Sequence, residues 1–177
     1  MDVPTGRPER RTRSAWEPPS SSSLKFNTDG AFIPPSSKAA SGVIARDCGG
    51  KVVWWFSGRV VASSALMAEA WALRIACSAA RDQGLTSVCF EMDCKELAEF
   101  VGKENRSCPW EISTLVNDVR EMALDKDWIF VWCSRSSNQA AHWLAKRGLN
   151  KAPLMTSGSI PSVLLDIVSM DVTSRCA

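Results

Sequence analysis

The sequence predicts an α/β domain built on a five-stranded mixed sheet that is flanked by helices. Two observations predict this class: three strand-like segments with turn residues between them come first, and helical and strand-like segments alternate afterwards. Consecutive strands joined by short turns pair antiparallel, whereas strands separated by a helix pair parallel. With 177 residues, of which 45% are hydrophobic, the chain has material for one domain with a substantial core.

The first three strands are expected between residues 24 and 61. Apolar and polar residues alternate from Leu24 to Asp29, which is the period of a half-buried strand, and Gly30 is expected to end this strand. A Pro-Pro-Ser-Ser turn then leads into two β-rich runs, Ala39–Arg46 and Lys51–Val61. Because the glycines of the Asp-Cys-Gly-Gly segment between them can adopt positive φ angles, these runs are predicted to form an antiparallel hairpin.

Helices and strands alternate in the rest of the chain. Apolar residues recur at steps of three and four from Leu66 to Ala80, the spacing of an amphipathic helix, and Gly84 follows it. The short apolar run Ser87–Asp93 then fits a parallel strand that is buried on both faces. Further along, the pattern predicts helices at 95–101, 110–124 and 138–147, the last of them ended by Gly148, and a strand at 128–133.

The predicted domain extends over residues 24–150. Residues 1–23 are rich in Arg, Pro and Ser and have little apolar periodicity, so we expect a disordered linker there. Residues 151–177 are expected to form a C-terminal extension with a short helix at 163–169.

Charge and composition exclude several classes of protein. The 21 Lys and Arg nearly balance the 19 Asp and Glu, so the net charge of +2 implies that any contact with nucleic acid is local. No apolar run approaches the roughly 20 residues of a membrane-spanning helix, and the N-terminus lacks the apolar core of a secretory signal. The seven cysteines include no C-x-x-C pair, so we expect reduced cysteines that serve as packing residues and not a disulfide framework or a zinc site. We expect a monomer in the cytoplasm or nucleus, without a membrane partner.

Three carboxylates occupy positions where the hydrophobic pattern would not place them. Asp29 ends the first strand, Asp93 ends the fourth, and Glu69 lies on the apolar side of the first helix. A single residue of this kind is usually a turn, cap or solvated residue. A carboxylate beside a core is costly, however, unless it is paired or bound to a metal, and clustered carboxylates repel until a hard divalent cation neutralises them. The three acids, from separate elements, therefore predict one shared site.

Four short motifs, in order along the chain, resemble those of the ribonuclease H fold. They occur on the predicted elements from about Lys25 to Gly148, and the chain is more closely similar to plant ribonuclease H-like domains, found alone or after non-LTR retroelement reverse transcriptases. Each motif is unspecific alone, whereas four in order are specific. The motifs are Asn27-Thr28-Asp29-Gly30-Ala31, Ala68-Glu69-Ala70-Trp71-Ala72-Leu73, Phe90-Glu91-Met92-Asp93 and Asn138-Gln139-Ala140-Ala141-His142-Trp143-Leu144-Ala145.

This resemblance implies a metal-dependent endonuclease that hydrolyses the RNA strand of RNA–DNA hybrids, and it allows a former link to a reverse transcriptase. Asp29, Glu69 and Asp93 would be the catalytic residues that bind two ions, Mg²⁺ or Mn²⁺. His142 stands at the fourth catalytic position. The candidate contacts to the hybrid substrate are Asn138, Arg135 and Lys146.

Three departures from the family pattern leave an alternative open. The family ordinarily has Asp at the position of His142, although histidine recurs there among plant members; neutral imidazole suits Mn²⁺ better than Mg²⁺ and can shuttle a proton. Relatives often place a histidine just before the residue that matches Arg135. Ala65 and Leu66 lack the polar side chains that many members direct at the RNA 2′-hydroxyl. The alternative is a ribonuclease H-like module that binds nucleic acid or another partner with weak or no turnover.

Overall fold

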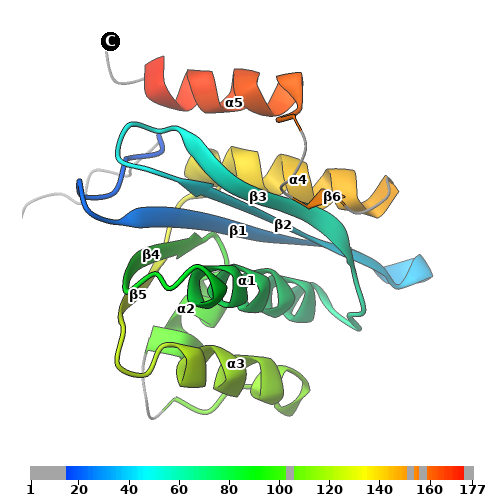
Figure 1. The fold of residues 1–177 in the computed structure, drawn as a ribbon. Coiled ribbons are helices and arrows are strands. Elements are labelled where there is room, and N and C mark those ends of the chain that lie inside the picture. Colours follow the sequence, from blue (N-terminus) through cyan, green and yellow to red (C-terminus); the bar gives the residue numbers. More distant parts are fainter. Residues whose placement is uncertain (1–14, 103–105, 151–153, 156–158, 174–177) are drawn as a thin grey trace, which may run out of the picture.

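The computed structural model describes residues 15–102, 106–150, 154–155 and 159–173. A mixed sheet with the strand order β5-β4-β1-β2-β3-β6 forms the centre of the molecule (Figure 1). The first three strands pair antiparallel, and β4 and β5 run parallel to β1, so the five predicted strands and their directions are confirmed. The bounds are β1 Leu24–Ile33, β2 Lys38–Arg46, β3 Val52–Val60, β4 Ser87–Met92, β5 Asp127–Trp132 and β6 Leu154–Met155.

Helices cover both faces of the sheet (Figure 1). On one face, α1 (Ala65–Asp82), α2 (Lys95–Gly102) and α3 (Trp110–Met122) enclose the larger core, which includes Phe26 and Phe90. On the other face lie α4 (Gln139–Asn150) and α5 (Ser162–Thr173), with a smaller core around Ile44, Leu144 and Leu164. Two short 3-10 helices lie in connections: η1 (Pro34–Ser36) joins β1 to β2, and η2 (Arg135–Asn138) joins β5 to α4.

Two glycines of the sheet allow helices to approach it closely. A Cβ at Gly30 would lie less than 3.0 Å from backbone atoms of Ala68 and Glu69 in α1. A Cβ at Gly42 would lie equally close to the backbone of α4. Backbone atoms cannot move aside as a flexible side chain can, so these two positions fix α1 and α4 against opposite faces of the sheet.

Two glycines predicted to end elements lie inside them instead. Strand β1 continues past Gly30 to Ile33, because residues 30–33 keep pairing with β2. Helix α4 continues past Gly148 to Asn150. At Gly148 the absent side chain serves packing, since a Cβ there would lie less than 3.0 Å from Ala40 and Gly58 of the sheet. A glycine needed for close packing looks in the sequence like a glycine that ends a helix.

The segment before β1 differs from the expected linker. From residue 15 it lies on the sheet, and Trp16 is completely buried. The Arg46 guanidinium stacks 3.8 Å from the centre of the Trp16 ring, and Lys25 Nζ donates a hydrogen bond of 2.7 Å to the backbone oxygen of Glu17. One isolated tryptophan among Pro and Ser gives no periodic signal, which is why the sequence does not reveal this packing. Residues 1–14 of the predicted linker lie outside the described residues.

The composition led to expectations about membrane-spanning helices and about cysteines. Within the described part of the chain, no helix has the length and apolarity needed to cross a lipid bilayer. The cysteines at 48, 77, 89, 94, 108 and 133 are all free, and Cys77 is fully buried in the larger core. Burial raises the pKa of the Cys77 thiol well above its usual value, which fits a packing residue rather than a nucleophile.

Candidate active site

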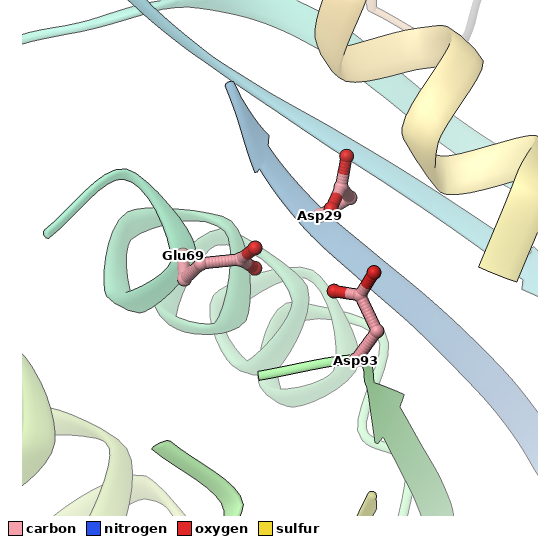
Figure 2. A group of neighbouring side chains, drawn as sticks. All are labelled: Asp29, Glu69 and Asp93. Atoms are coloured by element: carbon pink, nitrogen blue, oxygen red, sulfur yellow. The ribbon is translucent and has the colours of Figure 1, made fainter. Parts of the chain in front are cut away.

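Three carboxylates from three different elements point toward one another (Figure 2). Asp29 lies in β1, Glu69 in the first turns of α1, and Asp93 directly after β4. One oxygen from each carboxylate lies within 4.8 Å of the others. The structure thus brings together the three acids that the sequence singled out, close enough for them to bind one metal ion together.

The local structure explains why these side chains meet. Thr28 of β1 pairs with Met92 of β4 in parallel register, so the residues that follow them, Asp29 and Asp93, are neighbours at the same edge. The close approach of α1 at Gly30 adds Glu69. The start of α1 is fixed by Ser64, whose side chain accepts a hydrogen bond from the backbone N–H of Met67 at 3.1 Å.

Burial and mutual repulsion raise the pKa values of two of these acids, Asp29 and Glu69. Asp29 is only 2% exposed, and burial, reinforced by the charge of Asp93, raises its pKa from 3.8 to about 6. The pKa of Glu69 is raised well above its usual value by burial and then by the charge of Asp29. The cluster is therefore costly to ionise without a cation.

A divalent cation fits the donor set of this cluster. The Oε2 atom of Glu69 is buried and has no hydrogen-bond partner among the described residues. A buried acceptor of this kind calls for an explanation, and carboxylate oxygens are the ligands that Mg²⁺ and Mn²⁺ prefer. Asp29, Glu69 and Asp93 therefore form a candidate metal centre.

His142 reaches the same cluster from the opposite side of the sheet. Its Nδ1 lies 2.9 Å from Oδ2 of Asp29, which fits a hydrogen bond donated by the imidazole N–H. The side chain is 18% exposed, so the ring is partly open to solvent. In this tautomer the Nε2 atom is the acceptor nitrogen of the ring.

The structure separates the three residues expected to contact substrate. Arg135 is near the acids, since its Nε lies 3.9 Å from Oδ2 of Asp93 while its side chain is 71% exposed. Lys146 lines, together with His142, a hollow of about 450 Å³ between α4 and α5.

Asn138 differs from that expectation. It is 1% exposed, and its Nδ2 donates a hydrogen bond of 2.9 Å to the backbone oxygen of Thr28. The amide therefore holds the end of η2, just before α4, to β1 next to Asp29 and does not face a substrate in this structure.

Trp132 is a neighbour of the site that the sequence analysis did not identify. It ends β5, is 53% exposed, and donates a hydrogen bond of 3.1 Å from Nε1 to the backbone oxygen of Asp93. The sequence signal was its position near the end of the strand predicted at 128–133, but alternation along that strand is too weak to tell an exposed tryptophan from a packing one.

The order of the strands, the helices on both faces and the acids at the edge shared by β1 and β4 define a protein of the ribonuclease H-like fold. Residues 27–148 match the model of the reverse transcriptase-like family, and the chain belongs to this family. No curated protein sequence matches the chain. The narrower expectation of a plant-type member stays a prediction.

Solved structures with the same fold include bacterial and archaeal enzymes. Ribonuclease H1 of Halobacterium salinarum NRC-1 is 22% identical, with a TM-score of 0.67 over 73% of this chain and 99% of its own. The N-terminal ribonuclease H domain of rv2228c from Mycobacterium tuberculosis is 19% identical, with a TM-score of 0.67 over 73% and 95%. A ribonuclease H1 isolated from compost, solved with an RNA/DNA hybrid, is 18% identical, with a TM-score of 0.65 over 72% and 96%.

Proposed function

We propose that this protein is a metal-dependent endonuclease that hydrolyses the RNA strand of RNA–DNA hybrids. The observation that carries the proposal is the cluster of Asp29, Glu69 and Asp93, whose oxygens lie within 4.8 Å of one another. Family membership and the similar compost ribonuclease H1, which was solved with an RNA/DNA hybrid, support the choice of substrate.

The three acids would hold two ions, Mg²⁺ or Mn²⁺. When bound, such ions lower the pKa of an attacking water and stabilise the departing oxygen of a phosphodiester. The protein contributes a fixed set of ligands. Burial shields Asp29 and the Oε2 atom of Glu69 from competing water, and the His142 N–H donates a hydrogen bond that holds Oδ2 of Asp29 in place. In the same tautomer, Nε2 of His142 is the ring nitrogen that has a lone pair for a proton or a metal ion.

The central experiment is cleavage of an RNA–DNA hybrid that carries a label on its RNA strand. The purified full chain is incubated with the hybrid in Mg²⁺ and, separately, in Mn²⁺, and Asp93→Asn serves as the inactive control. We expect cleavage by the wild type and none by the variant. Binding of the hybrid without cleavage by either ion would instead favour the alternative, a nucleic-acid-binding module without efficient turnover.

Changing His142 to aspartate is expected to raise activity in Mg²⁺ relative to Mn²⁺. A carboxylate is a harder ligand than imidazole and therefore favours Mg²⁺ more strongly. The measurement is the ratio of cleavage rates in the two ions for wild type and His142→Asp, with His142→Ala as the variant that lacks a ligand at this position. A ratio that does not change in His142→Asp would show that the side chain at position 142 does not bind the metal ion.

Arg135 is expected to contact a phosphate of the hybrid. Arg135→Ala should weaken hybrid binding and reduce the slope of log affinity against log salt concentration by about 0.7 to 0.9, the value for one lost phosphate contact. Fluorescence anisotropy at several salt concentrations measures the slope. Arg81→Ala is the matched control, because Arg81 lies exposed near the far end of α1, beside Asp82. Equal slopes in wild type and Arg135→Ala would contradict the contact.

A further inference from the structure

A buried polar network lies on the α4 side of the sheet, next to the acidic cluster. It consists of four charged side chains and one amide, and each is at most 8% exposed. Lys25 Nζ donates to Glu91 Oε1 at 2.5 Å, and Asn27 Nδ2 donates to Glu91 Oε2 at 3.1 Å. Arg46 donates from Nη2 to Asn27 Oδ1 at 3.1 Å and from Nη1 to Asp171 Oδ2 at 2.6 Å. We call Lys25, Asn27, Arg46, Glu91 and Asp171 the β1–α5 network.

This network lies next to two of the three acids, Asp29 and Asp93, along the chain. Asn27 of β1 pairs in register with Glu91 of β4. Asp29 follows Asn27 by two residues on β1 and therefore shares its face of the sheet, and Asp93 follows Glu91 by two residues, directly after β4. The hydrogen bond from Asn27 to Glu91 therefore joins β1 to β4 two residues before Asp29 and Asp93.

The network also reaches parts of the chain outside the region that matches the family. That region covers residues 27–148, whereas Asp171 belongs to α5 and Trp16 to the segment before β1. Arg46 connects both, because its guanidinium stacks on Trp16 and donates to Asp171. Helix α5 is thus joined to β1 by a chain of two hydrogen bonds, from Asp171 through Arg46 to Asn27.

Paired charges and directed hydrogen bonds hold the side chains of the β1–α5 network in one arrangement. Its two cations and two anions balance, so each buried charge has an oppositely charged partner. The planar guanidinium of Arg46 offers donors in a rigid fork that lysine cannot reproduce. By donating to Oδ1 of Asn27, Arg46 also fixes the orientation of that amide, which directs Nδ2 at Glu91. Removal of Arg46 would allow the amide to turn and would loosen the bridge between β1 and β4.

We propose that α5, through Asp171 and Arg46, is a positioning element of the acidic centre and sets the spacing between Asp29 and Asp93 that a metal ion needs. This inference rests on the proposed metal centre and deepens it, because it assigns a role in metal binding to a helix outside the family region. Outer partners that orient metal ligands typically change metal affinity or activity by about 10- to 100-fold when they are removed.

The test separates positioning from stability. In the double variant Arg46→Met with Asp171→Leu, apolar side chains of similar size replace the buried ion pair, an exchange that often preserves stability. Mn²⁺ binding to the full chain is measured by calorimetry, well below the unfolding temperature. We expect Mn²⁺ affinity to fall about ten-fold or more, even where urea unfolding shows stability close to wild type. Asp171→Glu, which keeps the carboxylate, should retain more Mn²⁺ affinity than Asp171→Asn, which removes the negative charge opposite Arg46.

The matched control is the ion pair of Arg74 and Asp118, which joins α1 to α3. It has the same N···O distance of 2.6 Å, but both side chains are 37% exposed. Arg74→Met with Asp118→Leu should leave Mn²⁺ affinity unchanged. Wild-type Mn²⁺ affinity in the folded Arg46 and Asp171 variants would overturn the positioning role and leave the proposed function intact. A wild type that binds no Mn²⁺ would overturn both, whereas Mn²⁺ binding without hybrid cleavage would overturn the hydrolysis alone.

Discussion

Asp29→Asn is expected to stabilise the metal-free protein at pH 7 and to remove its stabilisation by divalent ions. Burial and the charge of Asp93 raise the pKa of Asp29 from 3.8 to about 6, a shift of about two pH units, each worth about 1.4 kcal/mol. At pH 7 the ionised carboxylate therefore costs the folded, metal-free state roughly 3 kcal/mol, which a neutral amide avoids. Asparagine can still accept the hydrogen bond from His142.

The pH dependence has a definite sign. The folded state binds the proton of Asp29 more tightly than the unfolded state, so ionisation destabilises the fold. Stability of the metal-free wild type should decline as the pH rises from about 4 to about 6. Asp29→Asn lacks this contribution, so its stability should decline less over the same range.

Urea unfolding with a chelator at pH 4 and pH 7, followed by titration with Mg²⁺ and Mn²⁺ at pH 7, measures both effects. Asp118→Asn is the control, because Asp118 forms a half-exposed ion pair with Arg74. This control should lose less than about 1 kcal/mol and keep its stabilisation by metal ions. A metal-free Asp29→Asn protein no more stable than wild type, or one still stabilised by the ions, would contradict the candidate metal centre.

The sequence predicts the fold because its signals are local and repeated. Alternation from Leu24 to Asp29 and the helical spacing from Leu66 to Ala80 each require only neighbouring residues. The acids were found for a related reason: Asp29 and Asp93 were expected at the ends of two parallel strands, and in the structure each follows a residue of the pair Thr28 and Met92, although β1 itself continues to Ile33. Their meeting therefore followed from topology.

The partners of buried polar groups could not be predicted in the same way. Asn138 precedes α4, where an asparagine ordinarily caps a helix beside solvent, yet its amide binds the backbone of Thr28, which lies 110 residues earlier. Arg46 and Asp171 are 125 residues apart. A contact over such a distance leaves no periodic trace in a single sequence, so the support behind the acids becomes visible only in three dimensions.

Gly42→Ala is expected to destabilise the protein by about 3 kcal/mol or more, at the upper end of the cost of overpacking. An added Cβ would lie less than 3.0 Å from backbone atoms of Ala141, Leu144 and Ala145, so α4 must move away from the sheet. Gly42 is also the register partner of Asp29, and α4 carries His142. The same displacement should therefore break the hydrogen bond between His142 and Asp29.

Urea unfolding and metal titration of Gly42→Ala distinguish the roles of helix and acids. Gly49→Ala is the control, because Gly49 lies in an exposed turn and the nearest atom to the added Cβ is a side-chain oxygen of Asp47 at 3.3 Å. The free energy of unfolding of this control should change by about 0.5 kcal/mol or less. None of the three acids lies on α4, so a folded Gly42→Ala protein should still be stabilised by Mn²⁺, in contrast to Asp29→Asn. Loss of that stabilisation would mean that α4, and with it His142, is itself required to hold the ion.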